Sequence, residues 1–176
     1  MKYILSLLAF CFFLVFKSNA QTRSDVKLYG YVRPVTGGAP PRIMNKESNF
    51  LSYSSTKEKF SYMIYLEGPS KLRIYPVEMY IKGQRTGVKA ATVVQTPVEI
   101  KTGGNVAEYS KTVTLVPKTS KKVYHIDASS EMPSKSLKIA KVKAETNELV
   151  VVYKYGGKFY YAVQKKLIVL EPIVLQ

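Results

Sequence analysis

The stretch LVVVYKYGGKFYYAVQ, residues 149–164, decides the fold class of this chain. Both halves are rich in β-branched and aromatic residues, which favour strands, and Gly156 and Gly157 stand between them. Two glycines can adopt the positive φ angles that a two-residue hairpin turn requires. The stretch therefore predicts an antiparallel hairpin in which Tyr155 pairs with Lys158 and Tyr153 pairs with Tyr160.

The two faces of this predicted hairpin differ in chemistry. One face carries Val150, Val152, Phe159, Tyr161 and Val163, and we expect it to be core. The other carries Tyr153, Tyr155, Lys158 and Tyr160, together with Val151 and Ala162. Tyrosine supplies apolar contact area at low entropic cost and keeps a hydroxyl for hydrogen bonding, so Tyr153, Tyr155, Lys158 and Tyr160 are the candidate binding residues. Ordinary pairing of aromatic residues across strands gives the same pattern, and both interpretations stay open.

The rest of the chain repeats the same kind of signal. Short alternating runs are separated by Gly, Pro, Asn or Ser, and no segment keeps a 3.6-residue apolar period long enough to predict a core helix. This pattern predicts an all-β fold, an antiparallel immunoglobulin-like β-sandwich of about seven to nine short strands. A small β-barrel is the alternative.

Three segments carry more specific expectations. The apolar residues change phase around Pro76, which predicts a β-bulge or a strand that changes sheets, at a sheet edge. Residues 137–144 are weakly strand-like. Residues 167–170 are apolar on both faces, which indicates a strand covered on both sides, or alternatively a strand completed by another chain.

The chain begins with the three-part pattern of an export signal. Lys2 precedes an apolar run over residues 4–16, and the small residues Ser18 and Ala20 follow at the spacing that signal peptidase reads. The run would rise about 20 Å as a helix, short of a hydrocarbon core of about 30 Å. We therefore expect a cleaved signal peptide over 1–20, a single domain over 21–176 without a transmembrane segment, and a location in the periplasm, at the outer-membrane periphery or outside the cell.

The charge balance limits the classes of partner. The net charge is +15, and removal of Lys2 and Lys17 with the leader leaves +13. Such a balance favours acidic glycans, lipopolysaccharide head groups or an acidic protein, although the even spread of lysines is also typical of solvated strand faces. Nucleic acid is disfavoured, because the chain shows no recognition helix, zinc finger or RNA-binding signature.

The chain offers few residues for catalysis. Its one cysteine, Cys11, lies in the expected leader, so disulfides, thiolate metal sites and cysteine nucleophiles are excluded from the mature chain. His125, the one histidine, and Asp127 would share a face of a strand, as a base and its orienting carboxylate do. No nucleophile can be assigned to them, and no second histidine completes a common metal site. We expect no cofactor and no metal, and a hydrolase is a remote alternative.

These observations favour a non-enzymatic exported protein. We expect it to act as a binding or structural subunit of a cell-envelope or cell-surface assembly, through protein–protein contacts that include an envelope or outer-membrane partner. The alternative is a binding module for an acidic glycan or lipopolysaccharide, which the net charge and the tyrosines both favour.

Overall fold

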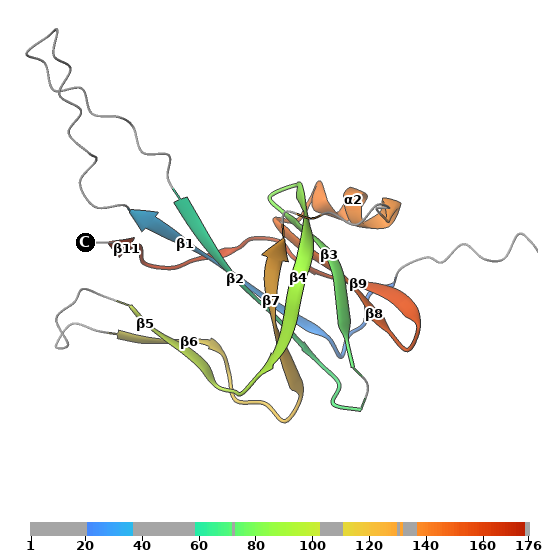
Figure 1. The fold of residues 1–176 in the computed structure, drawn as a ribbon, viewed down its shortest axis with the longest axis horizontal. Helices are drawn as coiled ribbons and strands as arrows, with labels where there is room; N and C mark the ends of the chain where they lie inside the picture. Colours follow the sequence, from blue (N-terminus) through green and yellow to red (C-terminus); the bar gives the residue numbers. More distant parts are fainter. Residues whose placement is uncertain are drawn as a thin grey trace, which may run out of the picture.

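A computed structural model describes residues 21–36, 59–71, 73–102, 111–129, 131 and 137–174. Most of these residues lie in strands, and α2 (Lys138–Ala144) is the one helix among them (Figure 1). The predicted all-β fold is therefore confirmed. The strands are β1 (Lys27–Thr36), β2 (Lys59–Gly68), β3 (Tyr75–Ile81), β4 (Gln84–Val94), β5 (Val98–Thr102), β6 (Lys111–Val116), β7 (Lys122–Ser129), β8 (Leu149–Tyr155), β9 (Lys158–Gln164), β10 (Ile168–Val169) and β11 (Ile173–Val174).

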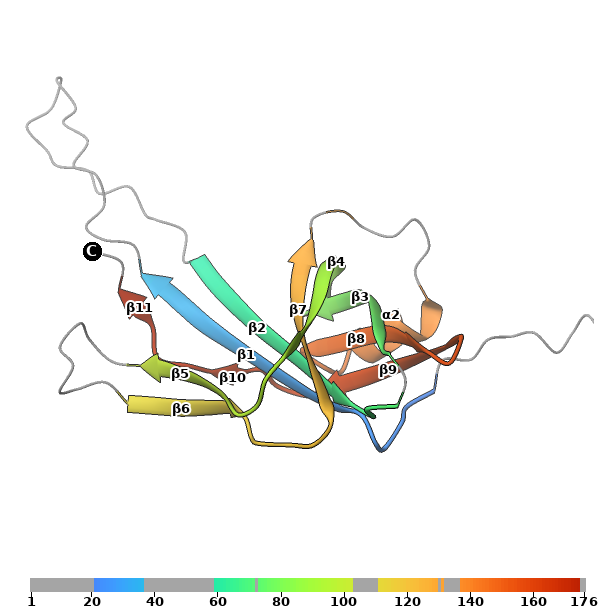
Figure 2. The ribbon, with the colours of Figure 1, turned by 60° about the horizontal axis from the view of Figure 1, so that its bottom comes forward.

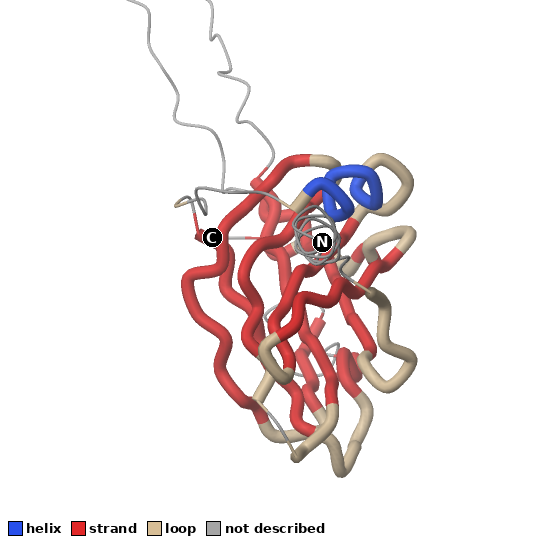
Figure 3. Tube along the Cα trace, turned by 90° about the vertical axis from the view of Figure 1, so that its right-hand side faces the viewer, coloured by secondary structure: helices blue, strands red, loops and turns tan. Residues whose placement is uncertain are grey.

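One continuous sheet organises the described residues. Its strands follow the order β10-β1-β2-β7-β4-β3-β8-β9, and β11 also pairs with β1. Strands β5 and β6 form a separate two-stranded ribbon. Figure 2 shows this ribbon beside β1 and β2, whereas α2 lies near β8 at the other end of the sheet. The end-on view in Figure 3 places the helix outside the strands.

This arrangement does not confirm the immunoglobulin-like sandwich, because the main strands join edge to edge in a single curled sheet. The expectation of a wholly antiparallel sheet is wrong for its last strands. Residue Ile168 of β10 pairs with Tyr31, and Ile173 of β11 pairs with Val35, both in parallel. Strand β9 ends beside Gly30 of β1. The chain continues from there along β1 and in the same direction as β1, so β10 and β11 pair with it in parallel.

The curl of the sheet is stabilised by the side chain of Gln164, which hydrogen-bonds to the backbone of β1 as a neighbouring strand would. The Oε1 atom of Gln164 accepts the backbone N–H of Gly30 at 2.6 Å, and its Nε2 donates to the Gly30 carbonyl at 3.0 Å. Gly30 has no side chain, and a Cβ there would collide with Leu149 and Leu167. These contacts bring β9, one end of the sheet order, against β1 near the other end.

The concave side of the curled sheet encloses the main core. Its buried members come from strands all along the sheet: Val32, Ile64, Leu66, Ile74, Met79, Ile81, Tyr124, Ile126, Leu149, Val151, Tyr153, Ala162 and Leu167. Burial of one large apolar side chain contributes about 1.5–3 kcal/mol, so this core is the principal source of stability.

Two smaller clusters cover parts of the convex side. Under the β5–β6 ribbon, Leu115 and Val116 pack with Tyr31, Tyr65, Val123 and Leu170. Under α2, Ala140 and Ala144 pack with Tyr80, Val150 and Val152. The sheet is thus buried on both faces where the ribbon and the helix lie, which explains why several of its strands are apolar on both sides.

In the stretch 137–144, expected to be weakly strand-like, Lys138–Ala144 form the helix instead, and Leu137 is its N-cap residue. Leu137, Ala140 and Ala144 are spaced three and four apart, so on a helix they share one face, and small alanines allow close approach to the sheet. The helix is also tied to β3 by a buried carboxylate. Glu78 accepts the backbone N–H of Leu137 at 3.2 Å and forms an ion pair of 2.7 Å with Arg85.

The bulge predicted at Pro76 is confirmed, since the pairing of β3 with β8 shifts between Pro76 and Glu78. The expected edge position is wrong, because β3 lies between β4 and β8. Proline lacks the N–H that a ladder requires, and the bulge accommodates this without placing the strand at an edge.

The contact between Gln164 and Gly30 generates a stability prediction. We expect Gln164→Ala to lower the free energy of unfolding by about 1–3 kcal/mol, because two backbone groups of Gly30 lose their partner. Urea unfolding measures the change. The matched control is Gln95→Ala, at an exposed position, which we expect to change the value by less than about 0.5 kcal/mol. Equal effects of the two substitutions would show that Gln164 does not hold the curl.

Candidate functional site

The β8–β9 hairpin forms in the register that its sequence predicts. Tyr155 pairs with Lys158 and Tyr153 pairs with Tyr160. Gly156 and Gly157 have φ angles of 56° and 79°, as the two-residue turn requires. The hairpin therefore presents its side chains in the predicted alternation.

The hairpin is buried on both of its faces, and not only on the face expected to be core. The face of Tyr153, Val151 and Ala162 points into the main core, and Tyr153 is 0% exposed. The face of Val150 and Val152 lies on the convex side against α2, where both residues are buried as expected, at 0% and 1% exposure. The physical reason is the curl of the sheet, since alternation along a strand cannot show which of two apolar faces becomes concave.

The four candidate binding residues are thus placed differently from one another. Tyr153 is buried, Tyr155 and Tyr160 are half-buried, and Lys158 is exposed at the tip. The rings of Tyr153 and Tyr160 stack at 5.9 Å, and those of Tyr155 and Tyr160 meet edge to face at 6.4 Å. The structure brings the three tyrosines together as a cluster, of which the outer two remain accessible. A role of these residues in binding stays a prediction.

The N-terminal segment closes over this tyrosine cluster. The carbonyl of Gln21 accepts the backbone N–H of Tyr161 at 3.1 Å. The guanidinium of Arg23 lies 4.3 Å from the ring centroid of Tyr155 and 5.5 Å from that of Tyr160. It also pairs with Asp25 at 2.6 Å, and this hydrogen bond lowers the pKa of the Asp25 carboxyl. Arg23 could not be found from the sequence, because the two tyrosine rings that it contacts lie more than a hundred residues away along the chain.

A second aromatic and cationic group lies on the convex side, where α2 ends. We call it the basic aromatic face, and it consists of Arg73, Tyr75, Lys143, Lys154, Phe159 and Tyr161. Tyr75 of β3 pairs with Lys154 of β8, and Lys154 pairs with Phe159 of β9, so these three form a row across the sheet. Tyr75 is 54% exposed. The hairpin signal identified Phe159 and Tyr161 and assigned them to the core, and both are partly buried against the cluster under α2.

The edge strand β10 exposes apolar side chains. Leu167 and Leu170 are buried, in the main core and under the ribbon respectively. Ile168 and Val169 between them are 50% and 69% exposed. The expectation that residues 167–170 are covered on both sides is therefore wrong for these two residues. The reason is that β10 lies at the end of the sheet order instead of in its middle.

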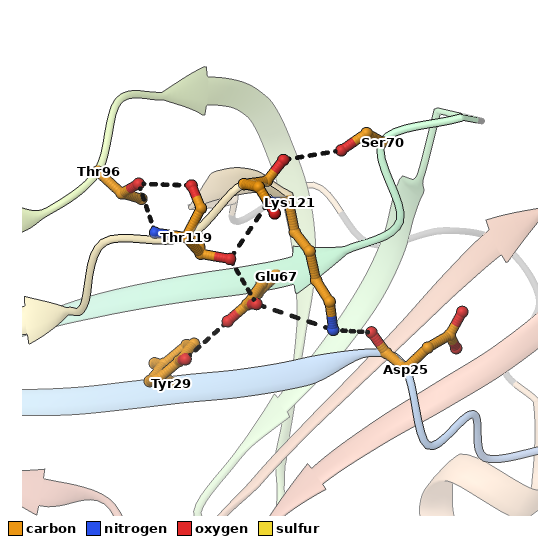
Figure 4. Close-up of polar contacts among 8 residues, drawn as sticks. Asp25, Tyr29, Glu67, Ser70, Thr96, Thr119 and Lys121 are labelled. Carbon is orange, nitrogen blue, oxygen red and sulfur yellow. Dashed lines mark hydrogen bonds and ion pairs between the residues drawn. The ribbon is translucent and has the colours of Figure 1, made fainter.

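A buried carboxylate organises the polar contacts where β1 begins and β2 ends (Figure 4). Glu67 accepts the hydroxyls of Tyr29 at 2.7 Å and Thr119 at 3.1 Å. The ammonium of Lys121 lies 3.9 Å from the same carboxylate and donates to the Asp25 carbonyl at 3.1 Å. Because its oxygens are all engaged, Glu67 acts as a structural tie between β1, β2 and the segment that precedes β7.

The same cluster holds the base of the β5–β6 ribbon. The hydroxyl of Thr96, just before β5, accepts the backbone N–H of Thr119 at 3.1 Å. On the other side, the hydroxyl of Ser70 donates to the carbonyl of Ser120 at 3.1 Å. The segments before β5 and after β6 are thereby fixed to the end of β2, which positions the ribbon over the convex side.

His125 and Asp127 share a face of β7, as their spacing predicts. The His125 Nδ1 atom lies 3.4 Å from Asp127 Oδ1, and the imidazole ring meets the ring of Tyr65 at 5.1 Å. The neighbours of His125 across the sheet are Tyr65 and Thr92. A hydrolase site would need a nucleophile hydrogen-bonded to the imidazole, and the described contacts of His125 are with Asp127 and an aromatic ring.

The described residues contain no group of three or more His, Cys, Asp or Glu side chains that could hold a metal ion. In the same part of the chain, no helix has the length and apolar character needed to cross a membrane. Comparisons with protein-family models, with curated proteins and with solved structures find no match to this chain.

Two buried tyrosines generate a matched prediction. The hydroxyl of Tyr153 is buried without a hydrogen-bond partner, whereas that of Tyr124 accepts the backbone N–H of Ile74 at 3.3 Å. We expect Tyr153→Phe to leave the free energy of unfolding unchanged or slightly higher, and Tyr124→Phe to lower it by about 1–2 kcal/mol. Urea unfolding of the wild-type protein and of the two variants measures these changes in the free energy of unfolding. A clear loss of stability in Tyr153→Phe would mean that its hydroxyl has a partner.

Buried tyrosines also predict a dependence on alkaline pH. Burial raises the pKa of Tyr29, Tyr31, Tyr65 and Tyr153. In the unfolded chain these hydroxyls ionise near pH 10, so above that pH the unfolded state releases protons that the folded state retains. The stabilisation is complete below about pH 10 and is lost as the pH rises further. Urea unfolding at a series of alkaline pH values should show this fall, and Tyr153→Phe should make it shallower. If the free energy of unfolding falls equally steeply with pH in the wild-type protein and in Tyr153→Phe, then burial does not raise the pKa of Tyr153.

Proposed function

We propose that this chain is an exported, non-enzymatic protein that serves as a binding or structural subunit of a cell-envelope or cell-surface assembly. It docks onto a partner protein through the exposed edge of its sheet. The observation that carries this proposal is the pair Ile168 and Val169, 50% and 69% exposed on the edge strand β10. Its place of action is the periplasm, the periphery of the outer membrane or the cell exterior.

The export part of the proposal rests on the sequence of residues 1–20, which lie outside the described residues. The positive start, the apolar run and the small residues Ser18 and Ala20 support a cleaved signal peptide. Cleavage after Ala20 makes Gln21 the first residue. Its carbonyl bonds to Tyr161 of β9, so the folded domain then begins directly at the cleavage site.

The docking part rests on the physics of sheet edges. An edge strand offers backbone N–H and C=O groups to another chain, and proteins that stay monomeric usually protect such edges with charges, proline or a covering segment. In β10 the residues at the edge are an isoleucine and a valine. Strand addition combines backbone hydrogen bonds with pockets for alternate side chains, and exposed apolar side chains on both faces of a strand suit such a contact.

A substitution on the edge strand β10 tests the docking proposal. We expect Val169→Lys to abolish co-purification of the partner from envelope fractions, because a partner chain would have to bury the new charge. The matched control is Val142→Lys, since Val142 is also exposed (56%) but lies on α2. Chemical cross-linking of the exported protein in envelope fractions, followed by identification of the linked residues, measures the contact.

Two results would contradict docking through β10. A wild-type protein that remains a free monomer after cross-linking has no docking partner of this kind. Equal loss of a partner with Val142→Lys and Val169→Lys would place the contact elsewhere than on β10.

A further inference from the structure

We propose that the basic aromatic face is a binding site for an acidic polysaccharide. This face is separate from β10 and adds a second activity to the proposed function. The choice of a saccharide over nucleic acid rests on the proposed export, whereas the anionic character of the ligand rests on the structure of the face alone.

The positive charge around the basic aromatic face is unbalanced. Neither α2 nor the β8–β9 hairpin contains an acidic residue, and together they carry Lys138, Lys141, Lys143, Lys154 and Lys158. Glu78 of the neighbouring β3 is 2% exposed, and its charge is taken up by Arg85. Glu145, directly after the helix, is the acidic residue nearest in sequence to α2. Positive charge concentrated in this way attracts anions and raises their local concentration.

The cations of the basic aromatic face are preorganised by the rings beside them. The guanidinium of Arg73 lies 5.2 Å from the ring centroid of Tyr75. The ammonium groups of Lys154 and Lys143 lie 4.8 Å from the ring of Phe159 and 5.8 Å from the ring of Tyr161. Cation–π contacts hold long side chains in place, so less side-chain entropy is lost when an anionic ligand binds. The three rings therefore hold three cations ready on one surface.

The groups of the basic aromatic face are spread over an extended surface. Tyr75, Lys154 and Phe159 pair across three neighbouring strands, so their row spans about 10 Å. Tyr161 lies two residues further along β9, about 7 Å from Phe159. Cations distributed over such an area match successive charged units of a linear polymer better than a single small anion. The ring of Tyr75, which is 54% exposed, adds an apolar surface and a hydroxyl that suit a sugar ring.

The test uses the protein purified after export, titrated by calorimetry with a polyuronate such as alginate at about 0.15 M salt. We expect the wild-type protein to bind alginate and not neutral dextran. Arg73→Ala/Lys154→Ala should weaken binding about tenfold or more, because two charge-assisted contacts are lost. The charge-matched control is Lys89→Ala/Lys118→Ala, which removes two exposed cations elsewhere and should change affinity less than about twofold.

A further pair of variants separates preorganisation from charge alone. Tyr75→Ala keeps every cation but removes the ring under Arg73, and it should weaken binding severalfold. Tyr75→Phe keeps the ring and should preserve most of the affinity. Because Tyr75 is mostly exposed, neither change should affect folding, and urea unfolding verifies this.

Several outcomes overturn the proposal. These are no binding of alginate by the wild-type protein, equal weakening by the control pair, or binding only of lipopolysaccharide or duplex DNA in parallel titrations. Val169→Lys distinguishes this site from the docking edge, because it should abolish partner docking and leave alginate binding unchanged. Loss of one activity without the other therefore shows which of the two proposals has failed.

Discussion

The contact between the Gln164 side chain and the Gly30 backbone is the constraint on which the rest of the structure depends. A sheet with this strand order would otherwise end in two unrelated edges, at β9 and near β1. The amide of Gln164 bonds to both the N–H and the C=O of Gly30, at 2.6 and 3.0 Å, as a paired strand would. It can approach because Gly30 has no side chain, and Leu149 and Leu167 occupy the space that a Cβ would need. Closure at this point makes one face of the sheet concave and buries it.

The curl determines what each side of the β8–β9 hairpin does. Tyr153 becomes part of the core on the concave side, and Val150 and Val152 meet α2 on the convex side. Tyr153 is therefore structural, whereas the outer members of the tyrosine face, Tyr155 and Tyr160, are half-buried and lie next to Arg23. The face that carries Phe159 and Lys154 is the one that reaches solvent beside the helix. A substitution that opened the curl would change both faces together, because they belong to the same two strands.

The sequence allowed those parts of the fold to be predicted that depend on neighbouring residues. The turn at Gly156 and Gly157, the register of the hairpin and the bulge at Pro76 follow from local backbone chemistry, and all three are confirmed. The orientation of the hairpin could not be predicted, because both of its faces are apolar and only distant contacts decide which is concave. The helix α2 was missed because it has seven residues and its lysines alternate with apolar residues, as they would in a strand.

Prediction of the candidate sites was limited in the same way. Lys154, Phe159 and Tyr161 were visible in the hairpin, but Arg73 and Tyr75 join them only through the pairing of β3 with β8. Arg23 reaches the tyrosine cluster from the opposite end of the chain. The apolar run at residues 167–170 indicated burial, and the sequence could not show that its two middle residues belong to an edge strand.

The basic aromatic face and the edge strand β10 are exposed for the same geometric reason. The elements that cover the sheet are smaller than the sheet itself. A helix of seven residues is about 10 Å long, so α2 covers Val150 and Val152 but leaves Tyr75 and Lys154 exposed in the row of Tyr75, Lys154 and Phe159. At the other end, closure through Gln164 leaves β10 only two residues to pair with β1, and nothing in the described sheet pairs with its outer side. The uncovered row is aromatic and cationic, whereas the uncovered edge is apolar. Surfaces of such different chemistry suit different ligands, which is why a polyanion is assigned to the first and a protein strand to the second.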